Sequence, residues 1–325
     1  MLHGNNETEI STEANAVINC IKRVNNDSLQ INGVLQTNGA HTKTNGATTK
    51  CETSDSCKLF SITEIPKYLR FNPYVLSGYR KPNLTFWQCI RSLGYIHNET
   101  VNILSHGIPL LFFLVYIPRN IPWNEIAHPL LAYFHILGSV CPWLGSTLYH
   151  LFMNHESGEK LYVELLKWDV IGIWVTQSFG ASTTVYTSVR LCPHCFRCPF
   201  LILYALLSIR ALRDSAWASC VWRRRLGFSF LVFMRLIALS CRLVTIDYDE
   251  GSRWLHLIMQ ETLPIVGAFI SASRIPERWW PGTFDYIFNS HNIMHVFVIL
   301  GGMHMHYATC SDLMWLHQLE RNNNP

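Results

Sequence analysis

Long apolar stretches, joined by short polar connections, occupy most of this chain. Each is close to the about 20 residues that an α-helix needs to cross a bilayer. Seven of them follow one another, at approximately 101–118, 129–153, 161–184, 196–212, 226–246, 254–273 and 288–313. No soluble domain separates them. The sequence therefore predicts an all-α fold, a seven-transmembrane-helix bundle over residues 101–316.

Composition favours the same class of protein. Only 15% of the 325 residues are charged and 49% are hydrophobic, whereas a soluble domain usually carries about 25% charged residues. The net charge of +4 is mild, and no basic patch with interleaved aromatic residues points to nucleic acid. The eleven cysteines are scattered rather than spaced as a disulfide framework, so most are expected to be reduced.

Two segments precede the apolar part. Residues 1–58 are rich in Asn, Thr and Ser and cannot bury enough surface to offset the entropy of ordering, so we expect a disordered polar tail without a signal peptide. Residues 59–100 mix aromatic and basic side chains, as juxtamembrane segments at the headgroups do. Near-helical spacing within them predicts an interfacial helix, with a cytosolic loop as the alternative, from Phe86, Trp87, Ile90 and Leu93. Residues 317–325 would form a short C-terminal tail.

The distribution of basic residues among the short loops predicts the orientation of the bundle. With a cytosolic N-terminus, the inner side holds Lys81, Arg91, Lys160, Arg210, Arg213, Arg223, Arg224, Arg225, Arg274 and Arg278. The outer side then holds fewer, namely Arg119, Arg190, Arg197, Arg253 and Arg321, beside the acidic run at 247–250. This imbalance favours the N-terminus inside and the C-terminus outside, the reverse of a G-protein-coupled receptor.

Histidines within the apolar stretches are the candidate functional residues. His291 and His295 are four residues apart, so they lie on one helix face about 6 Å from each other. In the predicted orientation, His150 and Asp169 arrive at the same depth from the second and third stretches. Ser146 lies one turn before His150 on the same face. Polar groups left bare in hydrocarbon are costly, so this set is expected to be paired or metal-bound.

Three imidazoles from two predicted helices, together with an oxygen-bearing group, suit Zn²⁺, which prefers tetrahedral nitrogen, sulfur and oxygen ligands. Three protein ligands leave a fourth position for water, the pattern of catalytic sites, and zinc lowers the pKa of bound water to about 7. Asp169 is placed to hold that water, to accept its proton or to orient a histidine. Ser146 is placed to donate to an oxyanion or a ligand. A lone histidine in such a helix is more often a packing residue, so the zinc prediction depends on the whole set.

The remaining histidines are weaker candidates. His304 lies on the opposite face of its helix from His295, and His306 is about 16 Å further along the axis. His135 is about 22 Å from His150 by the same geometry. We expect these three to make structural or outer-leaflet polar contacts.

Two other groups of residues have open interpretations. The Cys-x-x-Cys-x-x-Cys run at 192–198 falls in an outer loop, where it would bind a second metal or form a disulfide. Arg235, Arg242 and Glu261 lie within the fifth and sixth stretches at depths that allow pairing. A structural ion pair is the first interpretation, and a polar contact with a ligand is the second.

Several short motifs resemble those of the progestin and adipoQ receptor family. They are Asn-Glu-Thr-Val-Asn-Ile-Leu-Ser-His at 98–106, Ser-Thr-Leu-Tyr-His at 146–150 with Asp169, Ile-Pro-Glu-Arg at 275–278, Phe-Asp-Tyr at 284–286 and Ser-His-Asn-Ile-Met-His at 290–295. The likeness covers roughly residues 68–316. In details at 70–72, 76–80 and 148–153, the chain is most similar to the family's fourth member.

The resemblance implies a seven-helix fold with a cytosolic N-terminus and a zinc site near the inner face. It implies that His150, His291 and His295 are the zinc ligands, that Asp169 holds the zinc-bound water and that Ser146 is the neighbouring polar residue. Family members are described as receptors for adiponectin or progestins, and some are related to lipid amidases that cleave ceramide.

We therefore expect an integral membrane receptor of the plasma membrane or Golgi, with a lipid, steroid-like or ceramide ligand and zinc-dependent ceramide hydrolysis. The alternative is a receptor whose zinc is purely structural. A channel or transporter is disfavoured because the polar residues cluster at one depth.

Overall fold

The computed structural model of the chain describes residues 58–217, 221–245 and 251–323. Its helices are α2 (Phe86–Arg91), α3 (Thr100–Asn120), α4 (Pro129–Phe152), α5 (Gly158–Val175), α6 (Ser182–Val189), α7 (His194–Trp217), α8 (Val221–Thr245), α9 (Gly251–Ser273) and α10 (Ser290–Asn323). Short turns are η1 (Lys67–Leu69), η2 (Ser92–Gly94), η3 (Trp123–Glu125) and the π-helical η4 (Thr176–Gly180). Within these three ranges, β-structure is limited to isolated bridges. The all-α prediction is confirmed, and the predicted tail at 1–58 lies outside the described residues except for Lys58.

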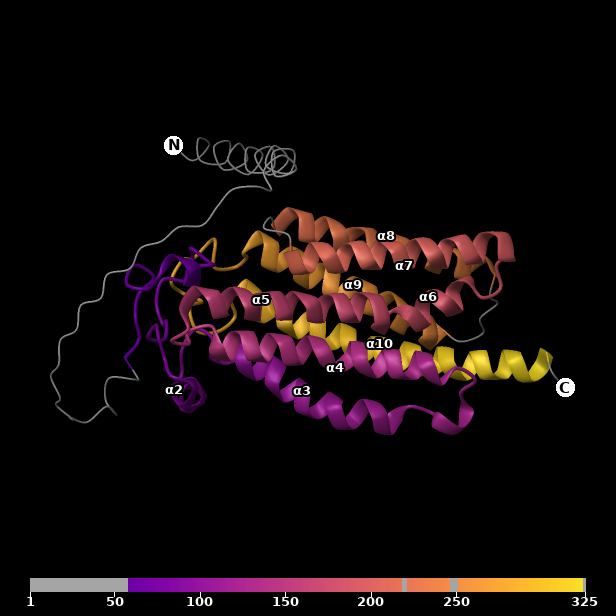
Figure 1. Ribbon diagram of the computed structural model, residues 1–325, viewed down its shortest axis with the longest axis horizontal. Helices are drawn as coiled ribbons and strands as arrows, with labels where there is room; N and C mark the ends of the chain where they lie inside the picture. Colours follow the sequence, from indigo (N-terminus) through magenta and orange to yellow (C-terminus); the bar gives the residue numbers. More distant parts are fainter. Residues whose placement is uncertain (1–57, 218–220, 246–250, 324–325) are drawn as a thin grey trace, which may run out of the picture.

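The long helices lie alongside one another in a single bundle (Figure 1). Each predicted apolar stretch corresponds to one helix, except that the third is divided into α5, η4 and α6. Five helices, α3, α7, α8, α9 and α10, are long and apolar enough to cross a membrane. The chain is thus a membrane protein, while the total of seven crossings and the cytosolic N-terminus stay predictions.

α10 is longer than its apolar stretch indicated. It continues through 34 residues to Asn323, beyond the predicted end at residue 313. Leu313, at the predicted end, and Leu316, beyond it, are buried, and Leu313 joins a core cluster with Ile121 and Ala132. The last turns of α10 carry few apolar residues of their own. Burial of these leucine side chains, including Leu313 against the start of α4, therefore stabilises them.

Glycines allow α4 to approach its neighbour unusually closely. A Cβ atom at Gly138 would lie 2.3 Å from Cα of Gly180 in η4. A Cβ atom at Gly145 would lie 2.8 Å from the carbonyl oxygen of Trp168 and 3.1 Å from Cα of Asp169. Since real Cβ atoms cannot approach so closely, only glycine fits at these two positions of α4. The close packing brings Asp169 next to the face of α4 that carries Ser146.

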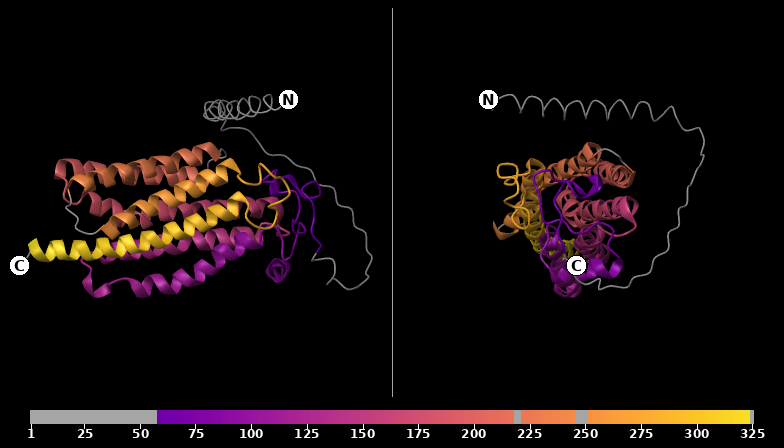
Figure 2. Two further views of the ribbon diagram at one scale, coloured as in Figure 1. Left: turned by 180° about the vertical axis from the view of Figure 1, so that it is seen from behind. Right: turned by 90° about the vertical axis from the view of Figure 1, so that its left-hand side faces the viewer.

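The segment that precedes α3 and the loop between α9 and α10 cover one end of the bundle (Figure 2). Arg80, which is 1% exposed, holds the end of α4 there. Its guanidinium donates to the carbonyl oxygens of His150 at 2.6 Å and Leu151 at 2.9 Å. Helix ends carry unsatisfied carbonyls and partial negative charge, so a buried cation stabilises this one and fixes the turn that contains His150.

A second buried charge holds the start of α10. Glu277, which is 0% exposed, accepts hydrogen bonds from the backbone N–H of Ser290 at 2.7 Å, from the Ser290 hydroxyl and from the Asn72 amide at 2.9 Å. Asp285 of the same loop accepts from the backbone N–H groups of Leu76 at 3.0 Å and Ser77 at 2.8 Å. These carboxylates attach the segment before α3 to the helix that carries the paired histidines.

Candidate metal centre

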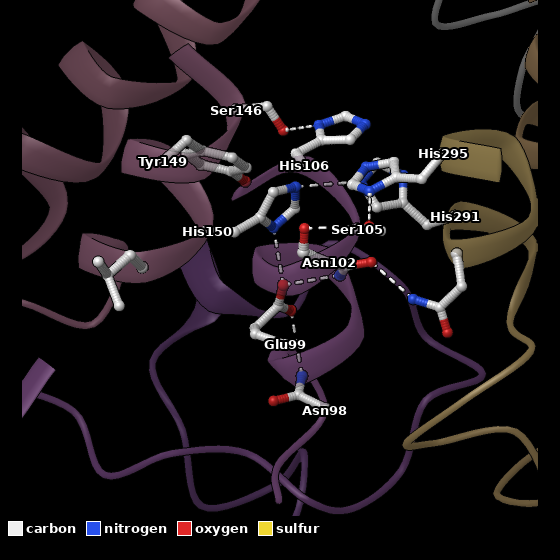
Figure 3. Close-up of polar contacts among 12 residues, drawn as sticks. Asn98, Glu99, Asn102, Ser105, His106, Ser146, Tyr149, His150, His291 and His295 are labelled. Carbon is white, nitrogen blue, oxygen red and sulfur yellow. Dashed lines mark hydrogen bonds and ion pairs between the residues drawn. The ribbon is translucent and has the colours of Figure 1, made fainter. Parts of the chain in front are cut away.

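The three predicted histidine ligands meet at this covered end of the bundle (Figure 3). His150 comes from α4, and His291 and His295 come from the first two turns of α10. One ligand nitrogen from each lies within 4.8 Å of the other two, and no other such group of three occurs in the part of the chain that the structure describes. The Nε2 atoms of His150 and His291 are 3.3 Å apart. Two nitrogens on one tetrahedral zinc, at bond lengths of about 2.0–2.1 Å, would be separated by about 3.3 Å.

In two of these imidazoles, Nδ1 already has a hydrogen-bond partner. Nδ1 of His150 donates to Oε2 of Glu99 at 2.7 Å, and Nδ1 of His295 lies 2.7 Å from the hydroxyl oxygen of Ser105. Because an ionised carboxylate only accepts hydrogen bonds, Glu99 keeps the proton on Nδ1 of His150 and leaves the Nε2 lone pair facing the centre. Metal-binding histidines are characteristically oriented by such partners. The donor set therefore fits a zinc ion.

Glu99 is itself held by neighbouring amides. It is 2% exposed, and it accepts from Asn102 at 2.8 Å and from Asn98 at 3.3 Å. Burial by itself raises the pKa of the Glu99 carboxyl, but the hydrogen bonds from His150 and Asn102 outweigh it and lower the pKa to about 2. Asn292 of α10 donates to Asn102 at 2.6 Å, so one polar network joins α3, α4 and α10 around the histidines.

A fourth imidazole lies against the cluster. The ring of His106 from α3 stacks on that of His295, with centroids 3.5 Å apart and planes 11° from parallel. Its Nδ1 is 2.6 Å from the hydroxyl oxygen of Ser146. Its Nε2 is buried and has no hydrogen-bond partner among the described atoms. Ser146 therefore contacts His106 rather than a metal ligand, and the bare Nε2 is free to bind a substrate or water.

Asp169 lies beside the cluster without being bonded to it. It is half-buried on α5, and it is close enough to His150 for a direct electrostatic interaction. Its carboxylate makes no hydrogen bond to any other residue that the structure describes. The three predicted ligands thus converge, and the two predicted polar residues, Ser146 and Asp169, flank them.

Known proteins resemble most of this chain. Residues 94–307 match the model of a family described as haemolysin-III related. The human protein "Progestin and adipoQ receptor family member 4" is 34% identical over 259 residues, which cover 79% of this chain and 94% of the relative. The chain belongs to the progestin and adipoQ receptor family. The resemblance that its motifs indicated, including that to the fourth member, is confirmed.

More distant relatives of this progestin and adipoQ receptor come from plants and insects. "Heptahelical transmembrane protein 1" of Arabidopsis thaliana is 27% identical over 279 residues, covering 79% of this chain and 82% of its own. The "Adiponectin receptor protein" of Drosophila melanogaster is 27% identical over 273 residues, covering 79% of this chain and 60% of its own.

The contacts of Glu99, Asn102, Ser105 and His106 were missed in the sequence, although all four lie in the 98–106 motif of this family member. A signal for them was present. A carboxylate and a histidine seven residues apart, at the start of an apolar helix, are ionisable groups at membrane depth, and such groups are functional candidates by default.

Four other histidines form two pairs outside the candidate metal centre, His135 with His306 and His256 with His304. Nε2 of His135 lies 3.0 Å from Nδ1 of His306, and both rings are buried. His256 and His304 approach to 2.8 Å between their Nδ1 atoms. These contacts agree with the structural role expected for His135, His304 and His306.

The structural ion pair predicted within the fifth and sixth stretches forms. Arg235 of α8 donates to both carboxylate oxygens of Glu261 in α9, at 2.8–3.0 Å. Arg242 does not share this partner. It pairs with Asp312 of α10, and both side chains are 0% exposed.

The cysteine run in the α6–α7 connection does not form a metal site. Cys192 is buried in the core formed with α7 and α8. Cys195 and Cys198 are exposed on the first turn of α7, and all three thiols are free. Because Cys192 points into the core and the other two point out of it, the three sulfurs do not converge on a common ion.

Proposed function

We propose that this family member is a zinc-dependent membrane hydrolase that cleaves the amide bond of a lipid such as ceramide, acting within a signalling receptor of the plasma membrane or Golgi. The observation that carries the proposal is the close group of His150, His291 and His295, in which Glu99 holds the ring of His150 and Ser105 holds that of His295. A zinc ion held there would polarise a lipid carbonyl and lower the pKa of a water molecule to about 7.

The surrounding residues supply what amide hydrolysis needs besides the metal. Asp169, unbonded and beside His150, would accept the proton of the attacking water and deliver it to the departing amine, so that the amide and one water give a fatty acid and an amine. Nε2 of His106, which is buried and bare, would hydrogen-bond the substrate. Ser146 would act as a positioning residue, because it holds Nδ1 of His106.

The second candidate is a receptor in which zinc is structural and a lipid or steroid-like ligand changes helix packing. It is favoured by the position of the histidines where α4 and α10 meet, since a metal there ties the two helices together. Two relatives carry receptor names, the human and the insect protein.

The deciding experiment measures bound zinc and ceramide hydrolysis together in purified protein. Wild type is compared with His291→Ala, Asp169→Asn and the control His304→Ala, which lies outside the cluster. Zinc retained with hydrolysis lost in Asp169→Asn is the expected result. Stoichiometric zinc without hydrolysis of any ceramide tested leaves the structural receptor, and wild type that binds no zinc contradicts both proposals.

A further inference from the structure

A dense group of arginines lies where α7 ends and α8 begins. It consists of Arg210, Arg213, Arg223, Arg224 and Arg225, here called the arginine cluster. Asp214 is the sole acidic residue between positions 170 and 246. The five arginines of the cluster and Asp214 together carry a net charge of +4, which equals the net charge of the whole chain. The cluster lies at the same end of the bundle as the metal centre (Figure 1).

Asp214 organises the cluster across the two helices. Its side chain is 4% exposed, and its oxygens lie 2.9 Å from Nε of Arg223 and 3.9 Å from Nε of Arg210. The two arginine side chains remain 37% and 58% exposed. The carboxylate thus fixes the position of two accessible guanidinium groups while offsetting a single charge.

The remaining positive charge is placed where the backbone adds to it. Arg223, Arg224 and Arg225 lie in the first two turns of α8, and the first turn holds no acidic residue. The N-terminal end of a helix carries about half a positive elementary charge, so cations there are disfavoured. Like charges on adjacent residues repel one another as well. Arg224 and Arg225 make further contacts of their own, and an anion bound there would add to these contacts by offsetting both effects.

The surroundings of the cluster indicate which kind of anion would bind there. Three large apolar side chains beside it are strongly exposed: Trp217 at 74%, Ile209 at 63% and Leu226 at 55%. Exposed apolar surface next to basic residues is typical of the level at which phospholipid headgroups lie. Every basic residue of the cluster is arginine, whose planar guanidinium binds phosphate oxygens in pairs, whereas lysine acts as a point charge.

We propose that the arginine cluster binds the phosphomonoester-bearing headgroup of an anionic phospholipid, of the polyphosphoinositide type, in the leaflet next to the metal centre. The alternative is a general attraction to negative surface charge, worth about 1 kcal/mol for each basic residue. That attraction would retain any anionic lipid according to its charge alone. A specific site would distinguish lipids of equal charge.

The test uses the full chain in nanodiscs of phosphatidylcholine, with either phosphatidylserine or phosphatidylinositol 4,5-bisphosphate added to equal total charge. Native mass spectrometry measures the lipid retained by the protein. We expect at least a tenfold preference for the bisphosphate. We expect the preference to vanish in Arg213→Gln, Arg224→Gln, Arg225→Gln, a triple variant that keeps both arginine partners of Asp214. The matched control removes three exposed charges elsewhere, as Arg91→Gln, Arg119→Gln, Arg321→Gln, and should keep the preference.

A second triple variant, Arg213→Lys, Arg224→Lys, Arg225→Lys, keeps the charge and is expected to lose most of the preference for the bisphosphate. It also provides the test if the glutamine variant does not fold. Equal retention of the two lipids by wild type would overturn the proposal. So would an unchanged preference in the folded glutamine variant or in the lysine variant. Soluble inositol phosphates that compete as well as the lipid would assign the cluster to a soluble anion instead, which also overturns it.

Discussion

Glu99 and His150 form a buried pair, with the carboxylate oxygen Oε2 2.7 Å from Nδ1 of the imidazole. This contact sets the tautomer and the direction of a proposed zinc ligand. Glu99→Gln is expected to lower zinc affinity about 10–100-fold, the usual effect of removing such a partner. Competition with a chromophoric chelator measures it. Glu159→Gln, at an exposed position on α5, should leave the affinity unchanged. Equal zinc affinity in both variants would show that Glu99 does not orient the ligand.

Glu277 should affect the same histidine site by stabilising the start of α10. Glu277→Ala removes the acceptor of the Ser290 backbone N–H and leaves Asn72 without its partner. Loss of a helix N-terminal acceptor costs about 0.5–2 kcal/mol, so the first turn of α10 should open more often. Hydrogen exchange of residues 288–295 is expected to accelerate about 2–30-fold while the rest of α10 keeps its protection. Glu320→Ala, near the other end of α10, is the control, and unchanged exchange in Glu277→Ala would contradict the prediction.

The pair between Arg242 and Asp312 should be costly to break on one side. Asp312→Leu leaves a fully buried guanidinium without its carboxylate, and such a loss costs about 3–5 kcal/mol. The double variant Arg242→Leu, Asp312→Leu removes both charges and is expected to recover most of that stability. Thermal unfolding in detergent measures both variants.

An exposed pair supplies the comparison for this experiment. Lys167 and Glu164 are 3.2 Å apart with 29% and 51% exposure, so Glu164→Leu should cost about 0–1 kcal/mol. If Asp312→Leu were as stable as Glu164→Leu, burial of the pair would be irrelevant to stability.

Close packing at Gly145 predicts an effect on both stability and activity. Gly145→Ala would place a methyl group 2.8 Å from the carbonyl oxygen of Trp168, so α4 and α5 must separate. Overpacking of this kind costs about 1–3 kcal/mol. Because Asp169 follows Trp168, proton transfer should suffer more than zinc binding does. Gly94→Ala, where a Cβ meets nothing within 4 Å, should behave as wild type in unfolding and hydrolysis assays.

Removing the metal should destabilise the wild-type protein. A ligand present at about 100 times its Kd adds about 2.7 kcal/mol, so a strong chelator should lower the unfolding temperature by several degrees. His291→Ala should unfold at the lower temperature with or without chelator. A chelator effect of equal size in wild type and His291→Ala would place the metal elsewhere.

Hydrophobic patterning was enough to locate the helices and to bring the three histidines together. Helix length and burial are properties of each segment, and the loop charges supplied relative depth, so His150, His291 and His295 were found without contact information. The division of the third stretch at η4 was not anticipated. The turn η4 packs closely against Gly138 of α4, and that contact depends on a partner helix rather than on the stretch itself.

For a related reason, the sequence did not show which acidic residue each arginine of α8 pairs with. Arg235 and Arg242 are seven residues apart on α8, and the sequence indicated only that either lies at a depth that allows pairing with Glu261. Which helix each one faces depends on how α8 is rotated against α9 and α10, and Asp312 lies in the part of α10 beyond the bulk of its apolar residues. The role of Glu99 likewise depends on where the chain before α3 turns into the bundle, which no periodicity reveals.

α10 has a property that follows from its length. It extends about 51 Å at the rise of an α-helix, and it is pinned twice, by His291 and His295 near one end and by Asp312 nearer the other. A rod fixed at two separated points cannot tilt or slide without breaking one attachment. If zinc binds the three histidines as we propose, it would therefore restrict the movement of the whole helix, and a change at this site would affect the position of the opposite end of α10.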